Sequence, residues 1–596
     1  MQLKFKDNFV GYFQFYYSVV GKKLFVSICL SIIVTVLDGF GLAMFMPLMQ
    51  SVSAEKGSPK QSMGKLHFVT DAITAMGFPL TLTTILGVLV LLFSVKGIFK
   101  FTEQNYQAGV IQFFMKRIRY NLVKGLENLT YKGFIKLDAG KIQNTFISEV
   151  QRMSQAVKFY LSYSQSFFML GTYIILALLA NYQFAILVAI SAGLTNVIYR
   201  RIYKSMKTAS FEISKKGNVF NSYMIQAIHY FKYLKSTNYF GTYARKLEGI
   251  INKTEYLNRK TAYYGAVTNG LREPMIVFIV TLVIYVQINW MGGNMGSIIL
   301  SLVLFYRALT FLLQIQTQWQ GFIQNTGAMR TVTDISEIMR NDVEINGVHR
   351  FTSINKEIKI ENADLSYGIN KVLNNVNIVI PKKQTIALVG ASGSGKTTLA
   401  NIIIGLMSPD SGQVLVDNIP LTEFNLNSYR SKIGYISQDS VIFNDNIYNN
   451  ITFWAEETPE NIKRFWEVIQ MASLEEFIAL QADRENTKLG DNGILISGGQ
   501  KQRISIAREM YKKAEILILD EATSALDSET EHIIQENIEN LHGHYTMIVI
   551  AHRLSTIRNV DTIYLLDKGK VTISGDFDSM LQNSEKFKRM VSLQGL

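Results

Sequence analysis

The chain has 596 residues, 48% of them hydrophobic, and carries a net charge of +13. This length is too great for a single core, and a soluble protein rarely contains so much apolar sequence, so a membrane part is expected. The positive charge could indicate nucleic-acid binding, but basic residues that gather beside apolar runs are better explained by membrane topology. Cys29 is the single cysteine, which excludes an intrachain disulfide and a cysteine-rich metal site.

Residues 1–20 predict an amphipathic helix that lies in the headgroup region of a membrane. The segment has neither the long aliphatic core nor the small-residue cleavage site of a targeting signal. An unstructured tail is the alternative, and the aromatic spacing argues against it. One helical face collects Phe5, Phe9, Tyr12, Phe13 and Tyr16.

A transmembrane domain is expected over residues 21–325, where six apolar runs each approach the roughly 17–25 residues that a helix needs to cross the hydrocarbon core. Six crossings place both termini on the same side of the membrane. Lys and Arg flank the ends of the runs that face this side, which predicts cytoplasmic termini. The runs are 24–49, 80–99, 161–180, 184–200, 275–291 and 296–313, and the flanking basic residues are Lys22, Lys23, Lys96, Lys100, Arg200, Arg201, Lys204 and Lys207.

Long cytoplasmic extensions are predicted after the second and fourth runs. Each of these two runs is followed by roughly sixty residues of mixed polarity, in which apolar residues recur at helical spacing and turn signals are few. At a rise of about 1.5 Å per residue, such stretches predict membrane helices that run far into the cytoplasm and fold back. A polar linker is assigned to residues 326–350.

An α/β nucleotide-binding domain of P-loop type is expected over residues 351–596. The segment QTIALVGASGSGKTTLANIIIGL predicts a buried strand, a glycine-rich turn and a helix, which is the context that a P-loop requires. The turn lets backbone N–H groups converge on phosphate, while Lys396 reaches the β and γ phosphates and Thr397 ligates Mg²⁺. The predicted ATP-binding residues of this loop are Gly390, Ser392, Gly393, Ser394, Gly395, Lys396, Thr397 and Thr398.

Two adjacent acids follow a second apolar strand, ILILDE. Asp520 is predicted to hold Mg²⁺, and Glu521 is predicted to polarise the water that attacks the nucleotide. An acidic pair after a strand is a weak signal by itself. Placed after a P-loop, the pair predicts ATP hydrolysis.

The segment ISGGQKQRISIAR, Ile496–Arg508, closely resembles the signature of ATP-binding cassette (ABC) proteins, whose usual form begins with Leu. Other residues match the family's motifs in order, namely Tyr367, Gln438, Asp527 in SALD and His552. The resemblance implies that Tyr367 stacks on adenine, that Gln438 takes part in metal binding and catalysis, and that His552 is catalytic. It covers the whole chain, because six spans with long cytoplasmic extensions followed by one cassette resemble an ABC exporter half-transporter.

The signature also predicts a dimer. Ser497, Gly498, Gly499 and Gln500 open a helix, whose positive end is able to grip a γ-phosphate. In the family that phosphate belongs to ATP held by the other cassette, so two chains would sandwich two nucleotides. Because this chain carries a complete set of motif residues, a homodimer with ATP and Mg²⁺ is predicted, with a heterodimer as the alternative.

Ionisable residues within the spans are the best guide to the substrate, because such residues are costly in a membrane and are by default functional candidates. Asp38 lies in the first run, Arg272 opens the fifth and Arg307 interrupts the sixth. Arginines that face a cavity would suit an anionic headgroup. Alternatively, Arg272 and Arg307 pair with Asp38 or Glu273 inside the bundle, or Arg272 simply lies at the cytoplasmic interface.

The stretch LDGFGLAMFMPLMQ is loosely similar to exporters that flip lipid A or lipid-linked oligosaccharides. The predicted function is therefore an ATP-driven exporter that moves an amphipathic lipid or lipid-linked glycan outward by alternating access. A multidrug or peptide exporter is the alternative, and an ATP-gated channel or regulator is an alternative of another class. The expected location is the bacterial inner membrane, in contact with its lipids and without a nucleic-acid partner.

Overall fold

The structure is a computed structural model, and it separates into two compact units, Met1–Val343 and Glu344–Leu596. The backbone is described for residues 8–45, 47–48, 71, 74–75, 77, 79, 81–180, 182–291, 295–520, 536, 539, 541–551 and 554–593. Side chains are described for the same residues except 177, 179–180, 182–200, 272, 276, 283–284, 286–291, 295–305 and 554–555.

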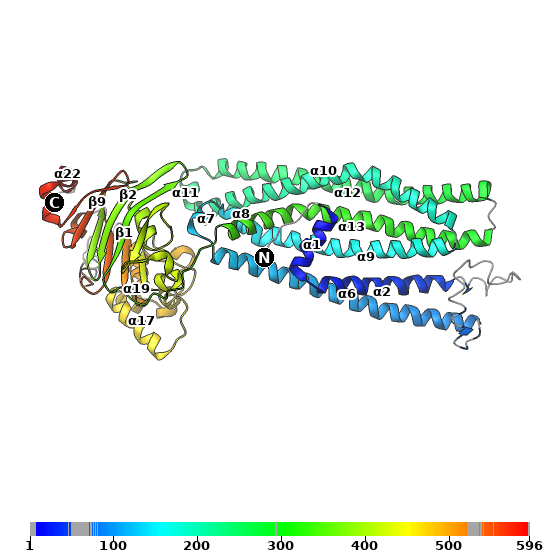
Figure 1. Cartoon of the computed structure of the whole chain (residues 1–596), viewed down its shortest axis with the longest axis horizontal. Helices are drawn as coiled ribbons and strands as arrows, with labels where there is room; N and C mark the ends of the chain where they lie inside the picture. Colours follow the sequence, from blue (N-terminus) through cyan, green and yellow to red (C-terminus); the bar gives the residue numbers. More distant parts are fainter. Residues whose placement is uncertain are drawn as a thin grey trace. The chain divides into compact units, whose positions relative to one another are not determined.

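The first unit is a bundle of long helices that run side by side, as Figure 1 shows. Short helices connect the long ones, and one turn of π-helix joins α8 to α9. The helices are α1 (Phe9–Val20), α2 (Lys23–Ala43), α6 (Leu82–Glu127), α7 (Tyr131–Ile135), α8 (Ala139–Asn144), α9 (Val150–Ala180), α10 (Tyr182–His229), α11 (Phe231–Ser236), α12 (Phe240–Met291) and α13 (Met295–Asn341).

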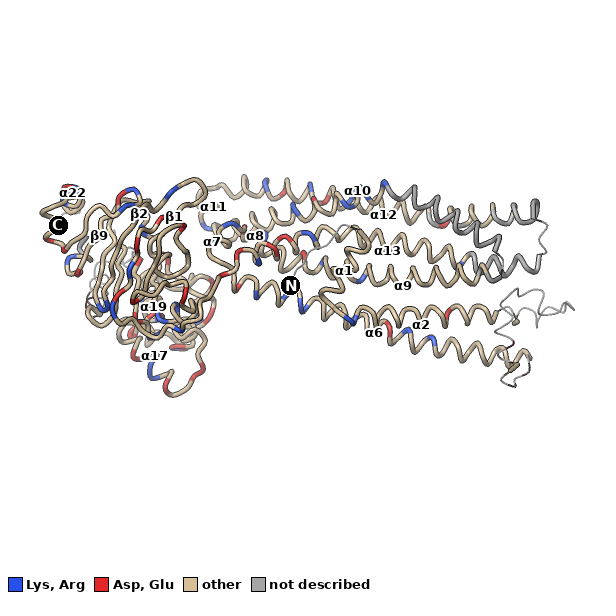
Figure 2. The backbone as a smooth tube through the Cα atoms, viewed as in Figure 1, with Lys and Arg blue, Asp and Glu red and all other residues tan. Residues whose placement is uncertain are grey.

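The long helices exceed what a membrane crossing needs. Helix α6 has 46 residues, which is about 69 Å at 1.5 Å per residue, more than twice the roughly 30 Å of a hydrocarbon core. Among the residues that the structure describes, α2 and α6 are long and apolar enough to span a membrane, so the count of six spans stays a prediction. Figure 2 shows charged residues concentrated along one half of the long helices, with few over the described part of the other half.

Helix α1 buries an aromatic face against neighbouring helices, and its placement in the headgroup layer stays a prediction. The helix begins where the Asn8 side chain accepts a hydrogen bond from the N–H of Gly11 at 2.7 Å. Tyr12 and Tyr16 are almost fully buried and pack against residues of α6, α9 and α13, whereas Phe9 remains 45% exposed. Aromatic residues occur on both sides of α1, and neighbouring helices supply a larger apolar surface for one of those sides.

The linker assigned to residues 326–350 begins later than the sequence predicted. Helix α13 continues without a break to Asn341, so most of that segment is helical. Apolar residues recur there at helical spacing and are buried in the bundle, which stabilises these extra turns. They are Ala328, Met329, Val332, Ile335 and Met339.

The second unit contains two sheets. One is four-stranded with the order β2-β1-β4-β5, and the other is six-stranded with the order β10-β9-β3-β8-β7-β6. The strands are β1 (Glu357–Tyr367), β2 (Asn370–Pro381), β3 (Thr385–Val389), β4 (Ser411–Val416), β5 (Ile419–Pro420), β6 (Ile433–Ile436), β7 (Ile516–Asp520), β8 (Thr546–Ile550), β9 (Thr562–Asp567) and β10 (Lys570–Gly575). The helices are α14 (Lys396–Ile403), α15 (Leu426–Arg430), α16 (Ile447–Thr452), α17 (Pro459–Met471), α18 (Glu475–Ala479), α19 (Gly498–Tyr511), α21 (Phe577–Asn583) and α22 (Glu585–Leu593).

The six-stranded sheet is parallel except at β10, and both of its faces are covered. Ile386 and Leu388 point into a core shared with α14 and the four-stranded sheet. The alternate residues Ala387 and Val389 point into a second core with α21 and α22. A sheet buried on both faces explains why the strand sequences are continuous apolar runs rather than alternating ones.

Candidate nucleotide-binding site

Four parallel strands end at the same edge of the six-stranded sheet. Leu388 of β3 lies opposite Ile550 of β8, which lies opposite Asp520 of β7, and Leu519 of β7 lies opposite Ile436 of β6. In open α/β sheets, ligands bind beyond the carboxyl ends of the strands. The glycine-rich loop, Gln438 and Asp520 are therefore brought to one edge, and the candidates Glu521 and His552 fall just outside the described residues.

The glycine-rich loop after β3 has a backbone that only glycine adopts readily. Gly390, Gly393 and Gly395 have φ angles of 157°, 76° and 105°. A Cβ atom on Gly390 would lie 2.3 Å from the carbonyl oxygen of Leu566, so even alanine does not fit there. The loop leads directly into α14, so its N–H groups lie at a helix N-terminus, where phosphate binds favourably.

Two buried side chains of this loop fit phosphate oxygens. Lys396 is only 6% exposed, and its ammonium donates to the carbonyl oxygens of Gly390 at 2.8 Å and Ala391 at 3.2 Å. The buried hydroxyl of Ser394 has no hydrogen-bond partner among the described residues. A buried donor without a partner is costly, so this hydroxyl is suited to a ligand oxygen. Ser392, Gly393 and Thr397 are exposed, and Thr398 is half-buried.

Asp520 fits the role of a magnesium ligand. It is 6% exposed at the end of β7, and the Tyr435 hydroxyl donates to its Oδ2 at 3.2 Å. Mg²⁺ usually takes one or two protein ligands and completes its shell with phosphates and water, which the Asp520 carboxylate and the Thr397 hydroxyl would allow. The described residues contain no cluster of three His, Cys, Asp or Glu, so they offer no all-protein cage for a metal. Gln438 is exposed at the same edge.

Tyr435 also connects Asp520 to the signature helix. The N–H of Tyr435 donates to Oε2 of Glu509 at 3.3 Å. Burial is the main cause that raises the pKa of Glu509, which lies on α19. The sequence analysis did not identify either residue, because the only local signal was a tyrosine in a strand three residues before Gln438.

Tyr367, the predicted adenine-stacking residue, ends β1 at the hairpin to β2. It is half-buried against the core between the two sheets, and its hydroxyl lies 3.1 Å from Sδ of Met407. The stacking role stays a prediction, because the contact partners of Tyr367 do not test it.

The signature residues form the start of α19. The Ser497 hydroxyl accepts from the N–H of Gln500 at 3.3 Å, and the Gln500 side chain accepts from the N–H of Ser497 at 2.9 Å. This reciprocal pair is a capping box, which satisfies two N–H groups at the helix start. Ser497 and Gly498 are exposed, and the preceding Ile494 and Leu495 are 79% and 70% exposed.

The membrane candidate Asp38 is paired inside the bundle with a lysine and a tyrosine. It is 6% exposed, forms an ion pair with Lys96 of α6, and accepts a hydrogen bond from the Tyr173 hydroxyl at 2.5 Å. Lys96 thus contributes to an internal pair rather than only marking a boundary. Arg307 is exposed and interacts electrostatically with Tyr173. The side chain of Arg272 lies outside the described residues.

A second buried acid lies on α6, two turns beyond Lys96, and the sequence analysis did not identify it. Glu103 is fully buried and accepts hydrogen bonds from Ser31 of α2, from Lys100 at 2.9 Å and from Gln165 of α9 at 3.0 Å. Its position lies beyond the predicted second span, so hydropathy gave no reason to single it out. Together the two acids link α2, α6 and α9 by polar contacts.

The described parts of the chain thus combine a P-loop nucleotide-binding domain with a bundle of long helices. The ABC transporter family matches residues 373–524. The heterocyst differentiation ATP-binding protein HepA of a Nostoc species is 31% identical over 487 residues, which cover 80% of this chain and 79% of that protein. An ATP-dependent lipid A-core flippase of Francisella tularensis is 29% identical over 525 residues, which cover 86% of this chain and 85% of the flippase.

The fold likeness extends over nearly the whole chain. A solved structure of a bacterial Atm1-family ABC exporter with ATP bound matches with a TM-score of 0.79 at 19% identity, covering 97% of this chain and 100% of that one. The chain belongs to the ABC transporter family. It is a half-transporter of the exporter type, similar to the lipid A-core flippases, and its nucleotide-binding domain couples ATP hydrolysis to transport.

Proposed function

We propose that this exporter moves an amphipathic substrate, a lipid or a lipid-linked glycan, from the cytoplasmic to the outer leaflet of the bacterial inner membrane. Both termini face the cytoplasm in this proposal, as the basic residues beside the apolar runs indicate. One observation supports the lipid more than any other, which is the similarity over 86% of the chain to proteins named as lipid A-core flippases.

In the proposed catalytic cycle, Lys396 and the N–H groups of the glycine-rich loop hold the phosphates of ATP. The Thr397 hydroxyl, the Asp520 carboxylate and Gln438 would hold Mg²⁺, which when bound would neutralise charge that develops on the phosphates. Glu521 orients and deprotonates the attacking water, and His552 assists the hydrolysis. The buried Ser394 hydroxyl and the register that brings Asp520 level with the end of β3 support this assignment.

A homodimer completes the site in this proposal. Ser497 and Gly498 are exposed at the start of α19, so the γ-phosphate of ATP bound to a second copy is able to reach them. The exposed apolar residues Ile494 and Leu495 precede them and offer surface for contact with another chain or helix. In a heterodimer, a different chain would instead supply these residues.

Arg307 is the best placed of the three substrate candidates. Asp38 already has Lys96 and Tyr173 as partners, so its carboxylate contributes first to holding α2, α6 and α9 together. Arg307 is exposed close to Tyr173, so its guanidinium is accessible to an anionic headgroup. Arg272 stays a candidate on sequence grounds alone.

The test is ATPase activity in nanodiscs, with lipid A, a lipid-linked oligosaccharide and a hydrophobic cation added in turn, and Glu521→Gln as the blank. We expect lipid A or the oligosaccharide to stimulate the wild type, and Arg307→Ala to remove that stimulation while basal activity persists. Arg340→Ala is the matched control, because Arg340 lies on the same helix and pairs with Glu337 at 3.9 Å. Stimulation by the cation alone would make the protein a drug exporter, and transport-independent ion current would make it a channel.

A further inference from the structure

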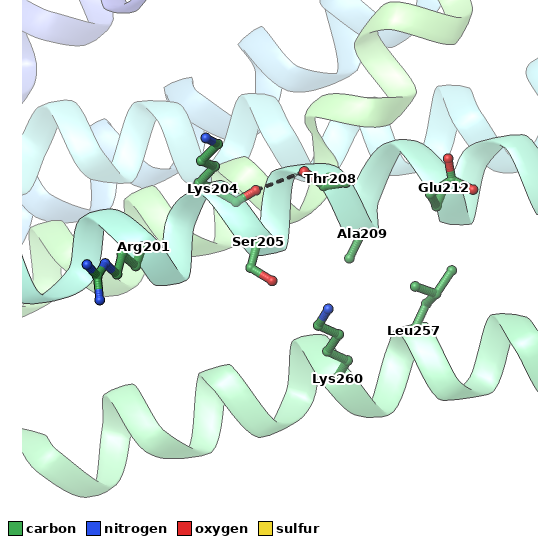
Figure 3. A pocket seen from close by; sticks show the side chains of 8 residues that line it. All are labelled: Arg201, Lys204, Ser205, Thr208, Ala209, Glu212, Leu257 and Lys260. Carbon is green, nitrogen blue, oxygen red and sulfur yellow. Dashed lines mark hydrogen bonds between the residues drawn. The ribbon is translucent and has the colours of Figure 1, made fainter.

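A pocket of about 370 Å³ lies between α10 and α12 in the first unit, apart from the proposed substrate residues. Its volume falls within the roughly 300–1,000 Å³ of small-molecule sites. Figure 3 shows Lys260 reaching from α12 toward Ser205 and Ala209 of α10. The lining residues are Arg201, Lys204, Ser205, Thr208, Ala209, Glu212, Leu257 and Lys260.

The pocket has an excess of positive charge that the protein itself does not neutralise. Arg201, Lys204 and Lys260 face a single acid, Glu212. In the described part of the chain, none of these four side chains makes an ion pair. Lys260 is half-buried, so its ammonium is partly removed from water without a counter-ion. A partly buried cation in this state is stabilised by an anionic ligand.

The position of the pocket along α10 indicates where that anion comes from. The apolar run ends at residue 200, so Arg201 and Lys204 lie within about 6 Å of its end, whereas Glu212 lies about 18 Å beyond it. The headgroup layer adds about 5–8 Å on each side of the hydrocarbon core. Arg201 and Lys204 therefore lie at the depth of the lipid phosphates, with Lys260 facing them from α12 at the inner edge of that layer, and Glu212 lies outside it.

The charge order also fixes the direction of binding. An anionic group at the Arg201 end is attracted by the three cations, and the same group at the Glu212 end is repelled. Ala209 is buried and Leu257 is half-buried, and they add apolar surface between the polar groups. This arrangement matches a lipid, whose phosphate stands at the membrane edge and whose glycerol and chain region is less polar.

We propose that the pocket between α10 and α12 binds the phosphate of an anionic lipid of the cytoplasmic leaflet through Arg201, Lys204 and Lys260. The site lies apart from the proposed substrate residues Asp38, Arg272 and Arg307. It rests on the proposed function in one respect, namely that this end of α10 faces the cytoplasm. Binding requires neither ATP nor transport.

The experiment is native mass spectrometry of the purified, nucleotide-free full chain in detergent, titrated with phosphatidylglycerol or phosphatidylcholine. A basic residue near a membrane surface contributes about 1 kcal/mol, so Lys260→Ala is expected to weaken phosphatidylglycerol binding about fivefold. Lys260→Arg keeps the charge and is expected to keep the affinity. Lys253→Ala is the matched control, because Lys253 is exposed on the same helix two turns further from the membrane and does not line the pocket.

Several results would overturn the proposal. Equal phosphatidylglycerol affinity in the wild type and Lys260→Ala would show that the pocket is not the site. Displacement of the lipid by an equal concentration of inorganic phosphate would make it a site for free phosphate. Loss of dimer mass in Lys260→Glu at unchanged lipid binding would assign the cations to the surface of a second copy.

The same preparations separate this proposal from the proposed function. Lipid A stimulation of ATPase activity is measured on Lys260→Ala and Arg307→Ala in parallel. If no lipid stimulates the wild type but phosphatidylglycerol still binds in a Lys260-dependent manner, the flippase proposal fails and the headgroup site stands. The reverse result would retain the flippase and remove the site.

Discussion

Replacement of Arg508 is expected to loosen the last turns of the signature helix from the segment that follows β6. Arg508 is 4% exposed, and its guanidinium donates to the carbonyl oxygen of Asn450 at 2.5 Å, to that of Val441 at 2.7 Å and to Oδ1 of Asn450 at 3.0 Å. The rings of Phe443 and Phe453 lie on it, with centroids 5.2 and 5.3 Å away. One side chain therefore holds α19, α16 and the aromatic residues around them together.

The magnitude follows from these contacts. Arg508→Lys keeps a cation but is unable to match the planar set of three donors, and loss of two charge-assisted hydrogen bonds at about 1.5 kcal/mol each costs about 3 kcal/mol. Weaker stacking on the two rings adds about 0.5–1 kcal/mol. Burial already lowers the pKa of Arg508, and a lysine in this place would lose its proton more readily, which adds to the destabilisation.

The assay is hydrogen exchange of the full chain in detergent, followed over residues 441–454 and 498–510. A local destabilisation of at least about 3 kcal/mol raises the open population at least about a hundredfold, so exchange in both segments accelerates by that factor or more. Arg558→Lys, an exposed arginine in the same unit, is the control and is expected to change stability by less than about 0.5 kcal/mol. Exchange in Arg508→Lys that matches the control would refute the role assigned to this side chain.

Three other predictions concern separate parts of the chain. Lys396→Ala is expected to lower ATP affinity at least about tenfold, measured with a fluorescent ATP analogue, because it removes a charge-assisted bond to phosphate; unchanged affinity would mean that Lys396 is not a phosphate ligand. Lys96→Met leaves Asp38 buried without its cation and should reduce heat stability in detergent by about 3 kcal/mol, whereas Lys96→Met with Asp38→Asn should recover more than half of that loss. Additive losses would show that the pair is not coupled. The Lys371 ammonium, with hydrogen bonds from Asn375 and Ser411, lowers the pKa of Asp364 to about 2. The ionised Asp364 carboxylate therefore stabilises the folded state above its unfolded pKa, and this stabilisation is lost as the pH falls toward 2. Asp364→Asn should make the decline of the free energy of unfolding between about pH 4 and 2 shallower.

Local patterns predicted more of the nucleotide-binding unit than of the bundle. The strand, glycine-rich turn and helix around Lys396 lie in one contiguous segment, so the sequence alone places them. The bundle depends on contacts between distant segments. Hydropathy places Lys96 at the end of a span but does not show that its side chain turns back to Asp38 on another helix. It gives no signal at all for Glu103, because that residue follows the apolar run.

The packing of the N-terminal helix also depends on contacts with distant segments. Its aromatic residues occur on more than one face, so periodicity predicts a helix but does not choose which face is buried. The choice depends on Tyr160 and Phe322, whose ring centroids lie 4.9 Å from Tyr16 and 4.7 Å from Tyr12. These partners are more than 140 residues away along the chain, where no local pattern connects them.

Lys396 and the start of α19 already have hydrogen-bond partners within this chain, which bears on how ATP acts. Lys396 donates to carbonyl oxygens of its own loop, and Ser497 and Gln500 cap each other. A bound phosphate must replace some of these contacts, so each new bond gains only the difference between a bond to the charged phosphate and the bond to a neutral group that it replaces, about 1 kcal/mol. Tight closure therefore requires many donors acting together on one phosphate. A glycine-rich loop on one copy and a helix N-terminus on another supply such a set, which explains physically why the exposed start of α19 is proposed to need a second chain.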